Sequence, residues 1–294
     1  MAVPEPMAVR AGDRRGAPGG ARVCRHFLAI VPLLLALLLA GCTTVTPPPD
    51  PQRATLPRPI VVIGGYLDPA ITATGLARWL RDASGEQRIL AVHPGLALSF
   101  DGAASRVVAE VERYFPNDDP AWTAEVDVIG ISMGGLVARH AAAPNDAGRR
   151  RLRIGRLYTI AAPHSGAQAA DWFGFIGTGL AMRSRSPFLK RLAERERLTD
   201  QDDYPIVAYT RSRDYTVGYG ASLPDHLAGE TVHYEVPWYT SGHLFAFRDA
   251  RLRADLLRRL RDVGDGPVTR VSAPSTRAGA SATRASVPSM IQMD

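Results

Sequence analysis

Short apolar runs recur along the middle of the chain and alternate with segments of helical periodicity. The runs are continuous and mostly β-branched, which is typical of strands buried on both faces of a parallel sheet. They span 60–64, 88–92, 126–131, 156–161, 206–209 and 232–236. Between or after them, residues 74–82, 103–114, 135–143 and 247–263 place apolar side chains at helical spacing. This alternation predicts an α/β domain with a mostly parallel sheet and helices on both faces.

The pattern stops at both ends of this domain. An apolar stretch from Phe27 to Ala40 follows Arg22 and Arg25, and it has the length of a secretory signal core rather than of a membrane span. Residues 43–59 carry six prolines without apolar periodicity, and the tail is rich in Ser, Ala, Thr and Pro. We expect a signal peptide over 1–41, a Pro-rich tether over 42–59, the α/β domain over 60–264 and a disordered tail over 265–294.

The apolar stretch ends in Leu39-Ala40-Gly41-Cys42, which resembles the lipobox of bacterial lipoproteins. In that family the peptide before the cysteine is removed and the cysteine is acylated. The resemblance therefore implies a lipoprotein signal peptide, a lipidated Cys42 and attachment to a membrane of the cell envelope. Thr43 follows the cysteine in place of an aspartate, which by the same resemblance favours the outer membrane. Removal of Cys24 would leave no disulfide within the mature chain.

Composition narrows the classes of function. A chain of 294 residues with 46% hydrophobic and 22% charged residues can bury the core of one large enzyme domain. The net charge of +6 includes a run of arginines over 149–153 that is typical of a solvated loop. Basic and aromatic residues do not interleave, so we expect no nucleic-acid partner. The sequence has no H-E-x-x-H, Cys–His cluster or P-loop, so no metal or cofactor is expected.

Residues 130–134, Gly-Ile-Ser-Met-Gly, form a G-x-S-x-G pattern between a predicted strand and a predicted helix. Such a turn exposes the serine oxygen at the tip of the strand, where a base can activate it. The backbone N–H of Met133, at the start of the helix, is then expected to bind the developing oxyanion. A second donor should come from the loop after the first strand. We name Tyr66, with Leu67 as its neighbour.

Two segments resemble the lipase branch of the α/β-hydrolase family. Residues 130–139, GISMGGLVAR, are similar to its GHSMGGLVAR elbow, with Ile131 in place of the usual histidine. Residues 161–166, AAPHSG, are similar to its TPHxG segment after the next strand. Members often have His-Gly in the oxyanion loop, where this chain has Gly64-Gly65. The resemblance covers about 58–264 and implies the α/β-hydrolase fold and a serine ester hydrolase that needs no cofactor.

The triad of that fold follows the order serine, acid, histidine along the chain. Asp214 lies after the strand predicted at 206–209 and matches the acid loop, whereas His243 matches the Gly-His position after the last strand. By this resemblance Ser132 attacks the substrate carbonyl, His243 moves the proton and Asp214 orients the imidazole.

Other residues compete for these roles. Asp225 is the main rival for the acid, because Asp202 and Asp203 precede the strand. The other histidines considered are four. His226 and His233 are typical of surface or strand positions, His140 lies on the helix predicted after the elbow, and the resemblance gives His164 a structural role.

The sequence leaves several questions open. Residues 163–205 contain many apolar side chains and form either a lid that receives acyl chains or a crossover helix packed on the sheet. The leading hypothesis is an envelope-anchored serine hydrolase that cleaves lipid or acyl esters. The alternatives are an acyltransferase using the same serine and a catalytically idle scaffold or binding lipoprotein. The physiological ester and the oligomeric state are not determined by the sequence.

Overall fold

The computed structural model describes residues 56–262, except for 67, 69, 95–97, 174–176, 199–203 and 244. The chain divides into one compact unit that ends at Val263 and a second from Gly264 to Asp294, and all described residues belong to the first. The predicted signal peptide, Cys42, most of the tether and the tail therefore lie outside the described residues.

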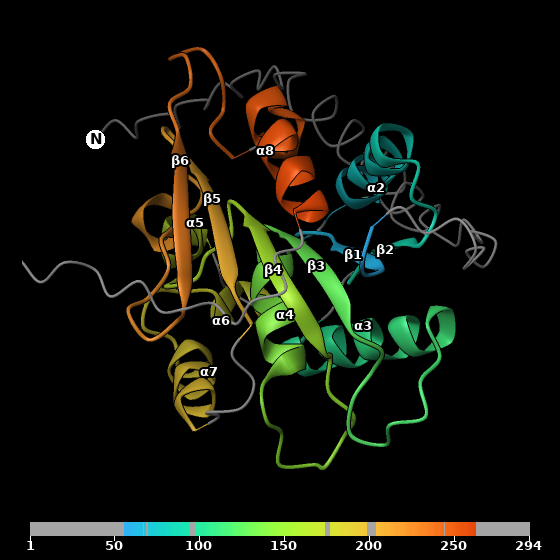
Figure 1. Ribbon diagram of the computed structural model, residues 1–294. Helices are drawn as coiled ribbons and strands as arrows, with labels where there is room; N and C mark the ends of the chain where they lie inside the picture. Colours follow the sequence, from blue (N-terminus) through green and yellow to red (C-terminus); the bar gives the residue numbers. More distant parts are fainter. Residues whose placement is uncertain are drawn as a thin grey trace, which may run out of the picture. The chain divides into compact units, whose positions relative to one another are not determined.

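Six parallel strands form one sheet in the order β2-β1-β3-β4-β5-β6 (Figure 1). Their bounds are β1 (Ile60–Ile63), β2 (Ile89–Val92), β3 (Val126–Ile131), β4 (Ile154–Ile160), β5 (Ile206–Arg211) and β6 (Gly229–Tyr234). Because every pair is parallel, all six carboxyl ends lie along the same edge of the sheet. The predicted α/β class and parallel sheet are confirmed.

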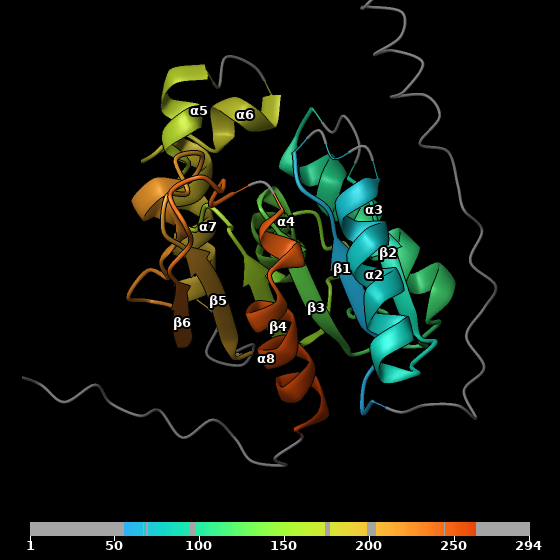
Figure 2. The same ribbon diagram turned by 90° about the horizontal axis from the view of Figure 1, so that it is seen from above.

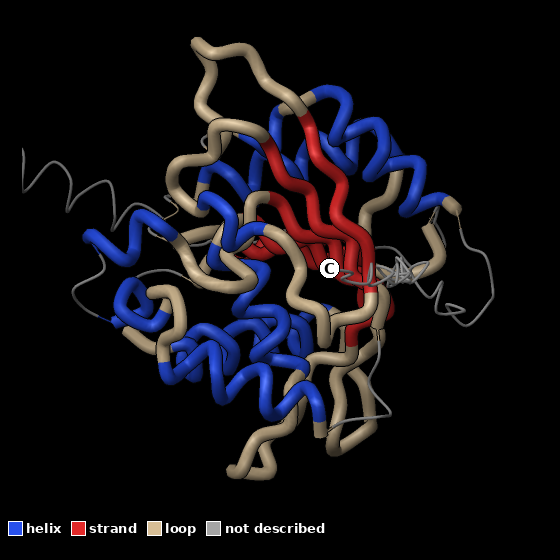
Figure 3. The backbone as a smooth tube through the Cα atoms, turned by 90° about the vertical axis from the view of Figure 1, so that its left-hand side faces the viewer, coloured by secondary structure: helices blue, strands red, loops and turns tan. Residues whose placement is uncertain are grey.

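Helices cover both faces of this sheet (Figures 2 and 3). Their bounds are α2 (Ile71–Ser84), α3 (Phe100–Tyr114), α4 (Met133–Ala142), α5 (Gln168–Phe173), α6 (Gly177–Ala181), α7 (Pro187–Arg197) and α8 (Ala250–Arg261), with short 3-10 turns η2 (Gly218–Ala221) and η3 (Ala246–Arg248). Val61 and Ile63 pack with α3 and α4, whereas Ile60 and Val62 pack with α2 and α8. Successive strand residues point to opposite faces, so a continuous apolar strand supplies two cores.

The structure shifts several predicted bounds. Helix α4 begins at Met133, directly after the serine, and not at residue 135. Strand β6 begins at Gly229, which pairs with Ile206 of β5, and not at residue 232. Most side chains of β6 are exposed. An exposed edge strand has no apolar pattern to reveal its start. The predicted closing helix is divided at Asp249, whose carboxylate accepts a hydrogen bond from the Arg251 N–H at 3.1 Å.

The long connection between β4 and β5 contains three short helices. The N–H groups of Gln168 and Ala169 donate to the carbonyls of Val217 and Thr216, on the loop after β5. Gly177, at the start of α6, lies against Leu98 on the loop after β2. Helices α5 and α6 therefore span the carboxyl edge of the sheet, while α7 buries Leu189 and Leu192 in the core. Whether the first two move as a lid stays a prediction.

No helix within the described ranges combines the length and apolarity needed to cross a membrane.

One carboxyl group is buried at the opposite, amino edge of the sheet. Asp127 of β3 is 2% exposed and lies 3.5 Å from Arg58 Nη1. Burial raises the pKa of Asp127 to about 6, although Arg58 and Arg156 oppose the rise. Because an ordinary aspartate in the unfolded chain titrates near 4, the folded state binds this proton more tightly. Its contribution to stability is therefore complete below pH 4 and is lost as the pH rises through 6.

We predict that Asp127→Asn raises the free energy of unfolding at pH 8 relative to the unmodified protein, by up to roughly 3 kcal/mol, since each pKa unit is worth about 1.4 kcal/mol. The advantage should disappear at about pH 3, below both pKa values, where the aspartate is mostly protonated in both states. Urea unfolding of both proteins at the two pH values measures this. If the difference in the free energy of unfolding between the two proteins does not change with pH, the raised pKa of Asp127 is contradicted.

Candidate active site

The candidate nucleophile stands on a strained turn at the carboxyl end of β3. Ser132 has φ 52° and ψ −122°, a conformation that non-glycine residues rarely adopt. Its N–H donates to the Ile160 carbonyl at 2.8 Å, and its carbonyl accepts from the Gly135 N–H at 3.1 Å. Strain of this kind persists only where the surroundings impose it, and it is typical of functional turns. The turn holds a half-buried serine at the edge of the sheet.

The turn is possible because backbones approach closely at two glycines. A methyl group at Gly134 would lie 2.3 Å from the carbonyl oxygen of Ile63, at the end of β1. One at Gly130 would lie 2.5 Å from the Gly135 Cα. Real Cβ atoms do not tolerate such distances, so the G-x-S-x-G spacing is a packing requirement here as well as a chemical one.

Met133 and Tyr66 carry the two backbone N–H groups that are predicted to bind an oxyanion. In the described part of the chain neither the Met133 N–H nor the Tyr66 N–H donates a hydrogen bond. Met133 opens α4, and the Gly65 Cα before Tyr66 packs on the serine, since a methyl group at Gly65 would lie 3.2 Å from Ser132 Cβ. Leu67, the neighbour also considered, lies outside the described residues.

The loops after β5 and β6 bring the predicted acid and base together. Asp214 Oδ2 lies 3.0 Å from His243 Nδ1. The other carboxylate oxygen accepts the N–H groups of Thr216 and Val217 at 3.1 and 2.9 Å, which fixes its direction. Gly242 allows the contact, because a methyl group there would lie 2.3 Å from the Asp214 N. The bonded Nδ1 leaves Nε2 of His243 for a substrate or a nucleophile.

The third contact of a triad is not closed. Within the described residues the Ser132 hydroxyl makes no hydrogen bond, either to His243 or to another group. Hydrogen bonds between catalytic groups are often long without substrate and tighten in the reactive complex. The triad of Ser132, Asp214 and His243 therefore stays a prediction, which the Asp214–His243 contact supports.

The rival residues are engaged elsewhere or stand apart. Asp225 is exposed on a turn, and its side chain forms no ion pair or hydrogen bond among the described residues. His233 bonds the Thr210 hydroxyl at 2.9 Å, and His140 contacts Asp101 at 3.0 Å. Asp202 and Asp203 lie outside the described residues.

His164 belongs to a buried network beneath the site. Arg139 of α4 donates to Glu196 of α7 through two hydrogen bonds of 2.7 Å, and His226 lies 3.0 Å from the same carboxylate. Arg139 Nη1 is 3.2 Å from His164 Nδ1, so that nitrogen accepts and Nε2 donates to Thr159 at 2.8 Å. Burial and the neighbouring Arg139 lower the pKa of His164 to about 3. His164 is thus neutral and a poor general base.

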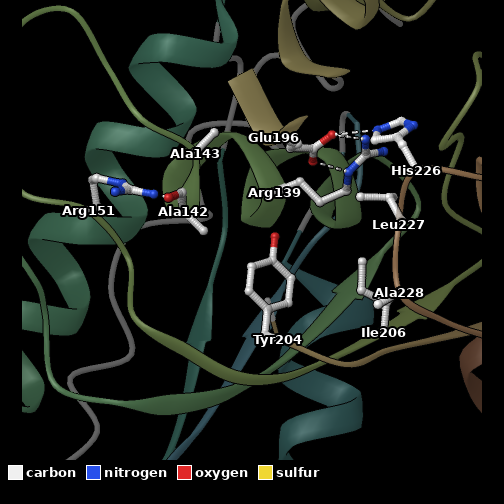
Figure 4. A pocket seen from close by; sticks show the side chains of 10 residues that line it. All are labelled: Arg139, Ala142, Ala143, Arg151, Glu196, Tyr204, Ile206, His226, Leu227 and Ala228. Carbon is white, nitrogen blue, oxygen red and sulfur yellow. Dashed lines mark hydrogen bonds and ion pairs between the residues drawn. The ribbon is translucent and has the colours of Figure 1, made fainter. Parts of the chain in front are cut away.

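A small pocket of about 50 Å³ opens beside this network (Figure 4). Figure 4 shows the Glu196 carboxylate facing both Arg139 and His226, with Tyr204 below them. Other lining residues, Ala142 and Ala143, come from the far end of α4. None of the predicted triad residues lines it, so we assign this pocket to the packing of α4 against α7 and not to catalysis.

No protein-family model and no curated protein sequence matches the chain. Among solved structures, a gene product from Listeria innocua matches with a TM-score of 0.51 and 11% identity, over 70% of this chain and 95% of its own. The esterase domain of a Rhodothermus marinus protein matches with a TM-score of 0.45 and 15% identity, over 72% and 89%. An esterase from Rhodococcus matches with a TM-score of 0.42 and 14% identity, over 70% of this chain and 91% of its own.

The chain has the α/β-hydrolase fold. At these identities the likeness establishes the fold and nothing finer. In the α/β-hydrolase fold the nucleophile stands on a strand-to-helix elbow, and the acid and the histidine follow it along the chain. The order of Ser132, Asp214 and His243 agrees with that arrangement.

Sequence reasoning missed two residues behind the oxyanion loop of this α/β-hydrolase fold. Asp68 and His93 follow β1 and β2 and contact each other at the carboxyl edge of the sheet. Only Asp68 left a signal, as an aspartate shortly before a helical pattern, which is typical of a helix cap. Nothing in the sequence indicates that His93 lies beside it. Within the described ranges, no group of three or more His, Cys, Asp or Glu side chains is placed to hold a metal ion.

We predict that Gly134→Ala lowers the free energy of unfolding by about 2 kcal/mol or more, because the added methyl group overlaps the Ile63 carbonyl. Gly75→Ala in α2 is the matched control, since its methyl group would meet Phe247 at an ordinary 3.7 Å. That helical substitution should leave stability unchanged or raise it by ~1 kcal/mol. Urea unfolding compares the two variants, and equal stability would contradict the tight elbow.

Proposed function

We propose that this chain is a serine hydrolase that cleaves carboxylic esters through Ser132, His243 and Asp214. One observation carries the proposal: an acid–base pair with Nδ1 and Oδ2 3.0 Å apart, at the same sheet edge as a serine on a strained elbow. The free N–H groups of Met133 and Tyr66 beside that serine add a place for negative charge. No other described serine combines these features.

The chemistry follows from these positions. Ser132 Oγ attacks the ester carbonyl carbon while its proton passes to Nε2 of His243, and the imidazolium is stabilised by Asp214. The carbonyl oxygen becomes an oxyanion that accepts the N–H groups of Met133 and Tyr66. The bond to the alcohol then breaks, and His243 donates its proton to the departing oxygen. Water attacks the acyl-enzyme by the same route in reverse, which releases the acid and restores Ser132.

Exposed apolar side chains support acyl or lipid esters as the substrate class. Nine of the ten large hydrophobic residues exposed among the described ones lie on segments that leave the carboxyl ends of strands. They are Tyr66, Ile71, Leu98, Trp172, Leu180, Tyr215, Trp238, Tyr239 and Phe245. Exposed apolar surface of this extent is typical of sites that bind apolar ligands or membranes. We call these nine residues the apolar rim.

The location of the enzyme is part of the proposal. Acylation of Cys42 would attach the chain to a membrane of the cell envelope, and Thr43 favours the outer one. Such a membrane would supply acyl esters close to the apolar rim. The membrane and an ester substrate are thus the proposed partners.

We predict that Ser132→Ala lowers ester hydrolysis by the detergent-solubilised full chain about 10⁴-fold or more, and that a fluorophosphonate probe no longer labels it. Asp214→Asn should lower kcat about a hundredfold or more, whereas Asp225→Asn, the control, should retain full activity. Initial rates with p-nitrophenyl esters measure these effects. Full activity of Ser132→Ala would overturn the assignment, and a folded, unlabelled wild-type protein would favour the idle scaffold.

We predict that Trp238→Ser on the apolar rim lowers kcat/KM for dodecanoyl esters about fivefold and leaves that for acetyl esters unchanged. The substitution removes apolar contact with the long acyl chain, which costs ~1 kcal/mol of binding free energy. Leu198→Ser is the control, because Leu198 is as exposed but lies at the end of α7, outside the rim. A ratio of long- to short-chain activity that Trp238→Ser leaves unchanged would exclude the rim from acyl recognition.

A further inference from the structure

The loop that carries the oxyanion donor Tyr66 ends at a buried carboxylate. The Asp68 side chain is 3% exposed. One of its oxygens accepts the Thr72 N–H at 3.2 Å, and the other accepts the Thr72 hydroxyl at 2.5 Å and the Ala73 N–H at 3.4 Å. Asp68 thus caps α2, whose own N-cap position, Ala70, has no side chain that can do so.

The same carboxylate packs against the back of the oxyanion loop. A methyl group at Gly64 would lie 2.5 Å from Asp68 Oδ2, so Gly64 and the carboxylate are in direct contact. On the other side of the loop, Gly65 packs on Ser132. The loop is therefore held between Asp68 and the nucleophile. Among the described residues of this segment, the Gly64 N–H donates to the Val92 carbonyl at 3.0 Å and the Asp68 N–H donates to the Gly65 carbonyl at 3.4 Å.

His93 supports the carboxylate from the loop after β2. Its Nδ1 lies 3.6 Å from Asp68 Oδ2 and is buried without a hydrogen-bond partner, while its Nε2 lies 3.0 Å from the Thr74 hydroxyl. Burial alone would raise the pKa of Asp68, but His93 and the hydrogen bonds from Thr72 and Ala73 lower it below the ordinary value. The carboxylate is thus ionised at neutral pH, with the His93 ring beside it.

We propose that Asp68, supported by His93, is a positioning residue that presses Gly64 and Gly65 against Ser132 and so fixes the oxyanion donor of Tyr66. This inference rests on the proposed hydrolase function. An oxyanion donor acts only within about 2.7–3.1 Å of the oxygen, and losing one costs about 10²- to 10³-fold in kcat. A loop that lacks its support therefore loses transition-state binding while substrate binding persists.

The first test removes the carboxylate. Serine at position 68 is too short to cap α2 from two residues before Ala70 or to place an oxygen against Gly64, so Asp68→Ser should lower kcat about tenfold to a hundredfold with KM within twofold. Asp68→Asn keeps the shape and should restore kcat to within about threefold of wild type. Asp101→Ser removes another carboxylate that contacts a histidine, His140, in the first turn of α3, and should leave kcat unchanged.

A double-mutant cycle separates the contact between Gly64 and Asp68 from helix capping, and its first arm, Gly64→Ala in the wild-type chain, stays informative if Asp68→Ser proves unstable. Gly64→Ala places a methyl group on the Asp68 carboxylate and should lower kcat at least tenfold in the wild-type chain. In Asp68→Ser the space is vacant, so the same methyl group should cost less than twofold. Additive effects of the two substitutions would overturn the proposal, as would a kcat for Asp68→Ser within twofold of wild type.

Failure of the positioning role is distinguishable from failure of the proposed function. If wild type hydrolyses esters and Asp68→Ser does so equally well, only the positioning role is wrong. If wild type neither turns over esters nor reacts with a fluorophosphonate, the hydrolase function is wrong and the positioning role falls with it. The assays use the full chain in detergent, with melting temperatures recorded for each variant.

Discussion

The approach of two backbones at the elbow is the constraint on which the rest of the site depends. Parallel pairing of β1 with β3 brings Gly134 so close to the Ile63 carbonyl that no side chain fits between them. This contact keeps Ser132 in its strained conformation and sets the first turn of α4, which Met133 opens. It also draws the loop after β1 alongside the serine. One steric requirement thus places the candidate nucleophile and the N–H groups predicted to bind an oxyanion.

The histidine–carboxylate contacts of this domain differ in what surrounds them. His226 shares Glu196 with Arg139 in a buried network, and that network ties α4 to α7. The pair of Asp214 and His243 lies on loops at the carboxyl edge, and Nε2 of its imidazole is left without a protein partner in the described residues. Only an imidazole that keeps one nitrogen for the substrate can move a proton during a reaction. The candidate base is therefore distinguished by its position at the carboxyl edge and by its available Nε2, more than by its contact with a carboxylate.

Exposed apolar side chains and fixed polar groups lie at the same carboxyl edge of the sheet. The segments that leave the strands carry the predicted oxyanion donors, acid and base, and they also carry the apolar rim. Helices α5 and α6 span this edge between the loops after β5 and β2. An ester with a long acyl chain needs both properties, because its carbonyl must meet fixed dipoles while its chain leaves water. The hydrolase acting beside a membrane that we propose would account for both together.

The sequence by itself determined the parts of this protein that repeat locally. Continuous apolar runs predicted the parallel sheet, because a strand buried on both faces must be apolar throughout, and the spacing of Gly130, Ser132 and Gly134 predicted the elbow. It missed the start of β6, whose exposed residues have no apolar pattern, and it could not show that His93 meets Asp68. The resemblance named Asp214 and left Asp225 as its rival. Only the tertiary structure showed that Asp214 is the carboxylate that contacts His243, because loops far apart in sequence meet only when the sheet aligns their strands.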